Sequence, residues 1–292
     1  MTAPAAGAAR TAPPRPPRPS HAKRNLAILG AAIVVVLCAL TVDLDPAEIL
    51  SLPGGVGLVF YEMFLAEGVE WSYFPDAMSY MLESLQIAWL GTVLGAIISL
   101  PLGFFGAKNV SSGVVSSVMR QLLNAIRAFP EVILAIAIMI PIAGLGPVAG
   151  MLALGLHSVG TLGKLTAEVI EGIDPGPVEA ARATGAAPLQ VQRWGVLPQV
   201  LPEIIAFWLY RFEINIRASA ILGVVGAGGI GFVLQQAISF TRFERAGMII
   251  LVVIGVTIVV DTISGWVRRR IIEGAEARIT GELVEQPELA EA

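Results

Sequence analysis

Residues 246–270 read AGMIILVVIGVTIVVDTISGWVRRR. Positions 246–267 of this stretch hold a single charged residue, Asp261, and three arginines follow at 268–270. A helix of about 20 apolar residues is long enough to cross the hydrocarbon core of a bilayer. Arginines directly after such a run are typical of its cytoplasmic end. The stretch therefore predicts a transmembrane helix that ends in the cytoplasm.

The composition of the whole chain agrees with a membrane location. Of its 292 residues, 55% are hydrophobic and 14% are charged, against roughly a quarter charged in an ordinary soluble domain. The mean hydropathy is +0.75. The net charge of −4 gives no basic surface for nucleic acid, and the single cysteine, Cys38, cannot form an internal disulfide. We therefore expect an all-α polytopic membrane protein in contact with lipid.

Five more segments predict transmembrane helices, which brings the expected number to about six. They are Leu26–Val42, Leu85–Gly106, Pro130–Ile142, Val148–Ile170 and Glu203–Val225. An amphipathic helix at Ser111–Phe129 is expected along the inner face of the membrane. A signal peptide is the alternative for the first run, but no small-residue cleavage site follows it. Six alternating crossings place both termini in the cytoplasm, and the basic residues at 1–24, 108–127 and 268–270 agree with this orientation.

The chain divides into four parts by composition. Residues 1–24 are rich in proline and alanine and predict a disordered cytoplasmic tail. Residues 25–84 predict the first transmembrane helix and an extracytoplasmic connector, because this segment contains no lysine or arginine. Residues 85–270 form the expected core domain. Residues 271–292 carry six glutamates and predict an acidic cytoplasmic tail.

A polar stretch at 174–202 interrupts the apolar runs on the expected cytoplasmic side. Pro177 and Glu179 favour the start of a short helix, and Gly185 favours its end. A second helix then leads into the next transmembrane segment. This pattern predicts a helical knob that projects from the membrane, although from the residues alone it could equally be a simple cytoplasmic loop.

The expected helix at 203–225 carries charged residues that must cross the bilayer. A charge at the bilayer centre costs at least ~2.5–3.5 kcal/mol, so Arg211, Glu213 and Arg217 should face protein or a water-filled path. Glu213 and Arg217 are four residues apart and are predicted to pair. Arg211 lies one turn from Asn215 with its donors expected to be free, and its guanidinium fork suits a phosphonate or phosphate oxyanion. A purely structural ion-pair network is the alternative.

Three other polar residues lie on the preceding helix. His157 is a further candidate for the substrate pathway, although a lone intramembrane histidine more often serves in packing. Lys164 and Glu168 are four residues apart, so we expect them to pair or Lys164 to extend to the membrane surface.

The polar stretch resembles the EAA signature of ABC-importer permeases. The match lies in Glu179-Ala180-Ala181, in Gly185 and in Leu197-Pro198. The run YRFEINIR at 210–217 resembles phosphonate-import permeases in particular. The resemblance covers about 85–270 and leaves both tails unassigned.

This resemblance implies a transport subunit of a bacterial inner membrane rather than an enzyme. The family works as a homodimer with two cytoplasmic ATPase subunits and an extracytoplasmic phosphonate-binding protein, by alternating access. It implies that Glu179, Ala180, Ala181 and Gly185 couple the permease to the ATPase. The implied substrate pathway contains Arg211, Glu213, Asn215, Arg217 and His157.

Two glycine-containing motifs do not indicate a nucleotide site. Gly226–Gly231 matches G-x-G-x-x-G but follows a membrane helix instead of a strand, so a tight turn is expected. Gly160–Leu165 lacks the residues of a phosphate-binding loop. We therefore expect no cofactor on this chain, with ATP and Mg²⁺ bound by the partner ATPase.

No pattern of catalytic or metal-binding residues stands out. The two histidines, His21 and His157, lie far apart in the sequence, so no metal site is predicted. The alternatives left open are a permease for phosphate, phosphite or methionine and, from other classes, a secondary carrier or a membrane enzyme.

Overall fold

The computed structural model describes residues 21–41 and 46–285, and every regular element there is helical. The prediction of an all-α fold is thus confirmed. The chain divides between Leu58 and Val59 into two compact units. The first unit holds α1 (Ala22–Thr41) and most of α2 (Pro46–Tyr61). Of the tail predicted at 1–24, only residues 21–24 lie within the described part, and α1 already begins at Ala22.

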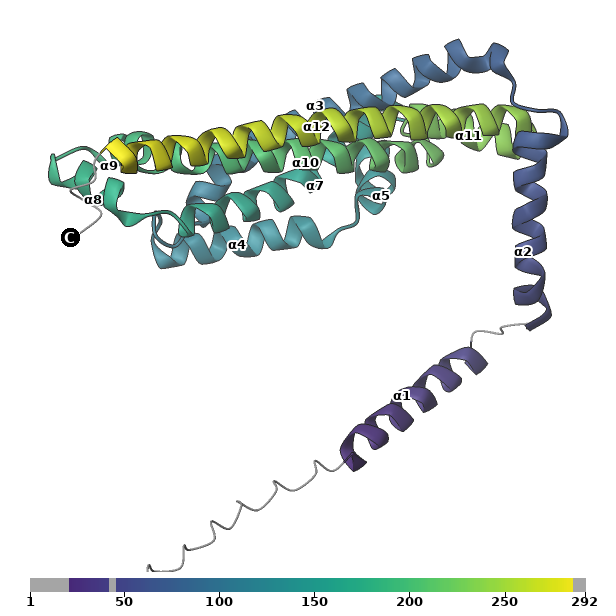
Figure 1. Ribbon diagram of the computed structural model, residues 1–292, viewed down its shortest axis with the longest axis horizontal. Coiled ribbons are helices and arrows are strands. Elements are labelled where there is room, and N and C mark those ends of the chain that lie inside the picture. The colour runs from purple at the N-terminus through teal and green to yellow at the C-terminus, as the bar shows by residue number, and fades with distance from the viewer. Residues whose placement is uncertain (1–20, 42–45, 286–292) are drawn as a thin grey trace, which may run out of the picture. The chain divides into compact units, whose positions relative to one another are not determined.

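The second unit is a bundle of long helices with shorter ones at its ends and on one side (Figure 1). The long helices are α3 (Phe74–Gly106), α7 (Pro147–Glu171), α10 (Leu197–Val224) and α12 (Phe243–Glu285). The shorter elements are η1 (Glu62–Ala66), η2 (Trp71–Tyr73), α4 (Gly113–Ala128), α5 (Glu131–Leu134), η3 (Ala135–Met139), α6 (Ile140–Ala143), α8 (Pro175–Ala183), α9 (Pro188–Val191), η4 (Gln192–Val196) and α11 (Ile230–Ser239).

Four helices in the described residues are long and apolar enough to cross a membrane. They are Lys23–Thr41, Trp71–Gly106, Pro147–Glu171 and Phe243–Gly274. A fifth crossing is obtained if α4 and the segment Glu131–Ala143, which meet at 85°, count as one broken span. The remaining predicted span is present as α10, whose 28 residues are long enough but include four charged side chains. That helix needs polar partners from its neighbours.

Two helix boundaries show how proline shapes the bundle. We expected the second crossing to start at Leu85, but α3 already begins at Phe74, with Pro75 and Asp76 in its first turn. Both residues favour a helix N-terminus. The amphipathic helix predicted at 111–129 is α4, and it ends where Phe129 takes an extended conformation before Pro130. The chain bends at that point.

Small residues let α3 and α7 pack closely along most of their length. A methyl group added at Gly95 would lie 2.5 Å from Ser158 Cβ, and one added at Gly103 would lie 2.6 Å from Thr166 Cβ. Such small residues are typical of tight helix contacts in membranes. This contact holds the middle of α7, where Ser158 lies, against α3.

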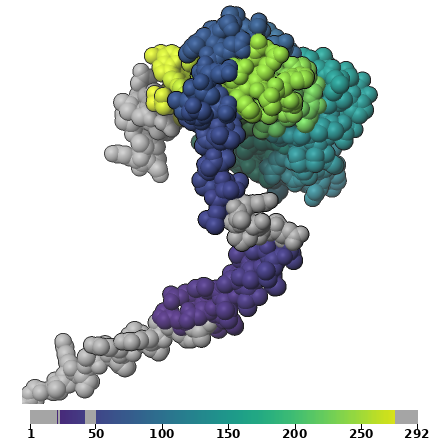
Figure 2. Space-filling view, turned by 90° about the vertical axis from the view of Figure 1, so that its right-hand side faces the viewer, coloured from purple at the N-terminus to yellow at the C-terminus, as the bar shows by residue number. Residues whose placement is uncertain are grey.

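The glycine-rich segment after α10 forms a tight turn, as predicted. Gly226, Gly228 and Gly229 have φ angles of +92°, +78° and +72°, which other residues rarely adopt. A side chain at Gly231 would overlap the carbonyl group of Ala220. The turn places α11 at the end of the bundle opposite to α8 and α9 (Figure 1). Seen end-on, the yellow-green residues of α11 and of the start of α12 lie beside blue residues from the N-terminal part of the bundle (Figure 2).

A charged contact closes the same end of the bundle. Arg245 donates hydrogen bonds from Nε and Nη2 to the Glu70 carboxylate, at 2.6 and 3.2 Å. This arginine lowers the pKa of the Glu70 carboxyl below its ordinary value. The guanidinium also lies 5.1 Å from the centre of the Tyr73 ring. Glu70 is thus the ion-pair partner of Arg245, and nothing in the sequence identified this pair.

Two glycines of α12 test how tightly this end is packed. A side chain at Gly247 would overlap the Met63 carbonyl oxygen, whereas Gly255 has open space around its Cα. We expect Gly247→Ala to destabilise the protein by about 1–3 kcal/mol, because helix and carbonyl must separate. Gly255→Ala should be neutral or slightly stabilising. Thermal unfolding in detergent measures both, and equal effects of the two changes would contradict this packing.

Candidate functional site

Helix α10 carries polar side chains on two different faces. Arg211 and Asn215 are one turn apart, and so are Glu213 and Arg217. A shift of two residues turns a helix by about 200°, so the two pairs point to different neighbours. The first pair contacts α3 and α7, and the second contacts α12.

The buried guanidinium of Arg211 anchors the first face. Only 6% of Arg211 is exposed. Its Nε donates to Ser158 Oγ at 2.9 Å, and its Nη2 lies 2.6 Å from His157 Nδ1. The expectation that all its donors are free is therefore wrong, because α7 places two polar residues against it. Within the described part of the chain, Nη1 has no hydrogen-bond partner.

Asn215 joins this group to α3. Its side chain is completely buried, and Nδ2 donates to Thr92 Oγ1 at 2.8 Å and to Ser158 Oγ at 3.1 Å. Its Oδ1 is buried without a hydrogen-bond partner in the described residues. Buried acceptors are normally satisfied. Within the described residues the group thus retains one acceptor without a partner, on Asn215, and one donor nitrogen without a partner, on Arg211.

Glu131 is a member of the group that the sequence did not reveal. It is the first residue of α5, and its Oε2 lies 3.4 Å from His157 Nδ1. The bend after Pro130 brings it to His157 from a different helix. We call Thr92, Glu131, His157, Ser158, Arg211 and Asn215 the α10 polar cluster. It combines one guanidinium and one carboxylate with hydroxyl, amide and imidazole groups on four helices.

The second face of α10 forms ion pairs with α12. Arg217 Nη1 donates to Asp261 Oδ2 at 2.9 Å, and Arg268 Nη1 lies 3.7 Å from Glu213 Oε1. The predicted pairing of Glu213 with Arg217 is therefore wrong. The two side chains share a face of α10, but each reaches across to an opposite charge on the neighbouring helix. Asp261 was visible as the only charge in its apolar run, and nothing in the sequence identified its partner.

The polar stretch at 174–202 contains the predicted short helix, α8. The Asp174 carboxylate caps it by accepting from the Gly176 backbone N–H at 2.9 Å. Gly185 follows it with φ +75°, and its N–H donates to the Arg182 carbonyl at 3.0 Å. Glu179 and Ala180 are exposed on α8, as is Gly185 beyond it, and Ala181 is half-buried. The residues of the EAA signature thus form an accessible surface.

The side chain of Gln199 fastens this helix to the start of α10. Its Nε2 donates to the carbonyl oxygens of Gly195 at 2.6 Å and Asp174 at 3.3 Å. Its Oε1 accepts from the Asp174 N–H at 3.1 Å. Gly195 also lets α8 approach closely, since a Cβ there would lie 3.1 Å from Val178 Cα. These contacts hold the start of α8 against the start of α10.

Residues 99–273 match the family described as binding-protein-dependent transport system inner membrane component. The chain belongs to this family. It is thus the multi-pass permease subunit of an inner-membrane ABC importer, has no catalytic activity of its own, and works with an ATPase and a binding protein. This agrees with an exposed α8 surface at one end of the bundle.

Two named permeases are similar to this chain over about two thirds of its length. The permease is 44% identical over 202 residues to the phosphite transport system permease protein PtxC of Stutzerimonas stutzeri, covering 67% of this chain and 73% of that protein. It is 38% identical over 198 residues to the phosphate-import permease protein PhnE of Mycolicibacterium smegmatis, covering 68% of this chain and 37% of that protein.

A solved structure confirms the fold. The inward-facing MetNI methionine ABC transporter matches with a TM-score of 0.59 at 21% identity, over 66% of this chain and 95% of that chain. At this identity the match establishes the arrangement of helices alone.

The pairing of α10 with α12 predicts a specific pattern in the permease's stability. Arg217→Ala or Asp261→Ala leaves one charge without its partner in an apolar setting, so each change should cost about 1–2 kcal/mol. The double change removes both charges, so it should cost less than the sum of the single changes. Thermal unfolding of the three variants in detergent measures this difference. Strictly additive effects would show that the ion pair contributes nothing.

Proposed function

We propose that this permease imports phosphonate or a related phosphorus oxyanion, such as phosphite or phosphate. It does so as a homodimer with both termini in the cytoplasm, by alternating access driven by the partner ATPase. The observation that carries the proposal is the α10 polar cluster, in which a buried arginine is held at the centre of the helix bundle. The phosphite and phosphate permeases among its relatives support the same substrate class.

The chemistry of the cluster suits an oxyanion with both bare and protonated oxygens. Arg211 Nη1 can donate to a P–O⁻ oxygen, and a planar guanidinium binds such groups with directed hydrogen bonds. Asn215 Oδ1 can accept from a P–OH group. Glu131 adds a negative charge near His157 that weakens the attraction of the anion. Weak binding favours transport, because a tightly held ion would leave slowly.

The exposed residues Glu179, Ala180, Ala181 and Gly185 form the surface that contacts the ATPase in this proposal. ATP and Mg²⁺ bind to that partner. ATP binding closes the two ATPase subunits, moves α8 and opens the path to the outside, where the binding protein delivers the anion. Hydrolysis returns the path to the inside.

Uptake by a reconstituted complex tests the substrate class. The permease is purified with its ATPase and placed in liposomes with the binding protein. We expect ATP-dependent, saturable uptake of phosphite, phosphate or methylphosphonate and none of methionine, which is the competing substrate because a guanidinium also binds carboxylates. Uptake of methionine alone would contradict the proposal, and uptake without ATP would identify a secondary carrier.

The role of Arg211 is tested in the same assay. Arg211→Ala should lower oxyanion uptake by about tenfold or more, since a charge-assisted hydrogen bond to the ion is lost. Arg211→Lys keeps the positive charge but loses the planar guanidinium, so its uptake should lie between that of wild type and that of Arg211→Ala. Arg242→Ala, at an exposed position, is the control and should transport normally. Undiminished uptake by an Arg211→Ala complex that assembles with its ATPase would assign this residue to packing.

The coupling surface gives a separate expectation. Glu179→Lys reverses a charge on exposed α8, and Gly185→Asp places a side chain where φ is +75°. Both variants should insert in the membrane while importing fewer anions per ATP hydrolysed. The measurement is the ratio of uptake to phosphate released from ATP. An unchanged ratio in both variants would remove this surface from the coupling step.

A further inference from the structure

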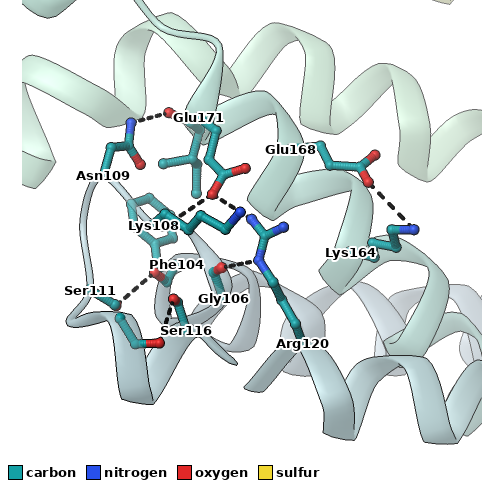
Figure 3. A network of polar contacts seen from close by, with 12 residues as sticks. Phe104, Gly106, Lys108, Asn109, Ser111, Ser116, Arg120, Lys164, Glu168 and Glu171 are labelled. Atoms are coloured by element: carbon teal, nitrogen blue, oxygen red, sulfur yellow. Dashed lines mark hydrogen bonds and ion pairs between the residues drawn. The ribbon is translucent and has the colours of Figure 1, made fainter. Parts of the chain in front are cut away.

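A network of polar contacts ties the last turn of α7 to the connection between α3 and α4 (Figure 3). Glu171, the last residue of α7, accepts a hydrogen bond from the Lys108 backbone N–H at 2.7 Å and forms an ion pair with Arg120 of α4. Arg120 Nε donates to the Gly106 carbonyl at 2.8 Å. We call Gly106, Lys108, Arg120 and Glu171 the inner clamp. It joins the ends of α3 and α7 through one side chain of α4.

Neighbouring contacts hold the same elements together. Asn109 Nδ2 donates to the Ile170 carbonyl at 2.6 Å. Leu123 of α4 is 1% exposed, and a Cβ at Gly163 would lie 2.7 Å from its Cδ2. A Cβ at Gly160 would lie 2.9 Å from the Leu123 carbonyl oxygen. Packing around Leu123 thus keeps α4 against the middle of α7, while the inner clamp fixes the end of α7 nearest to α8.

Glu171 lies very close in the chain to the start of α8. Only Gly172 and Ile173 separate it from Asp174, the cap of α8. At this same end, α8 is fastened to α10 by the hydrogen bonds between Asp174 and the Gln199 side chain. A force on α8 therefore reaches α10 directly, and it reaches the inner ends of α3 and α4 through the apolar cluster shared by Val178 and Phe104 and through the short link to the end of α7.

We propose that the inner clamp makes the inner ends of α3 and α4 move together with α7 when the ATPase displaces α8. Arg120 and Glu171 are positioning residues for this movement. Charge-assisted hydrogen bonds fix the relative orientation of the groups they join, and contacts between rigid helices can transmit such coupling. A half-exposed ion pair adds little stability, so its main effect is geometric. The proposal rests on the coupling role of α8 given above.

A double-mutant cycle in the complete complex tests the clamp. Four complexes are assembled from the ATPase, the binding protein with the ligand that it carries on purification, and one form of the permease. The four forms are wild type, Arg120→Ala, Glu171→Ala and the double variant. The readout is the ATPase rate with and without the binding protein. Each single change should leave the basal rate intact and lower the stimulation about three- to tenfold. The double variant should be no worse than either single change.

The chain offers a matched control on the neighbouring surface. Lys164 and Glu168 form the predicted ion pair at 3.6 Å on α7, drawn beside the clamp in Figure 3. Lys164→Ala and Glu168→Ala should leave stimulation at the wild-type level. Arg120→Lys, which keeps the charge, should restore part of what Arg120→Ala loses.

Two results would overturn the clamp proposal. One is wild-type stimulation in both single variants. The other is a loss that follows a fall in complex assembly or thermal stability, since that would reveal a purely structural contact. The readout needs no knowledge of the transported anion. Failure of the wild-type complex to import phosphite, phosphate or methylphosphonate would therefore count against the proposed function and not against the clamp.

Discussion

The arrangement of the bundle depends on the cost of placing charges in an apolar medium. Helix α10 is long enough to cross the membrane, yet it carries Arg211, Glu213 and Arg217 along its length. Each must find a polar partner. One face of α10 finds it on α3 and α7 and the other on α12. The charges thus specify which helices surround α10, in a solvent where apolar contacts alone discriminate weakly between neighbours.

The need for polar partners assigns different roles to the two pairs of polar residues on α10, which the sequence predicted to lie together in one substrate pathway. Glu213 and Arg217 are engaged by charges on α12 and stabilise the packing of two helices. Arg211 and Asn215 keep unused hydrogen-bonding capacity, since one has a nitrogen and the other an oxygen without a partner in the described residues. A group that retains such capacity can receive a ligand without first breaking a strong pair. Substrate contact is therefore expected at Arg211 rather than at Arg217.

Features that depend on local rules were predictable from the sequence. Apolar runs marked the crossings, Pro177 and Gly185 marked the short helix α8 to within two residues at each end, and the glycines after α10 marked a turn. Features that depend on neighbours in space were not. The pairing of Arg217 with Asp261 and the approach of Glu131 to His157 join residues far apart in the chain. Pro130 predicted a break but not the 85° bend that delivers Glu131.

The glycines of the bundle differ in how closely neighbouring atoms surround them. Contacts of α7 with α3 and α4 rest on glycines whose replacement would meet neighbouring atoms, so these helices cannot slide far without clashes. Around Gly185 and Gly172, by contrast, an added side chain would meet no other atom closer than 3.6 Å. The movement of α8 that we propose therefore meets less steric resistance at Gly172 and Gly185 than at the contacts of α7 with α3 and α4. In the proposed transport cycle, the contacts of Gln199 with Asp174 link α8 to α10, and the contact of Glu171 with Lys108 links the end of α7 to the connection between α3 and α4.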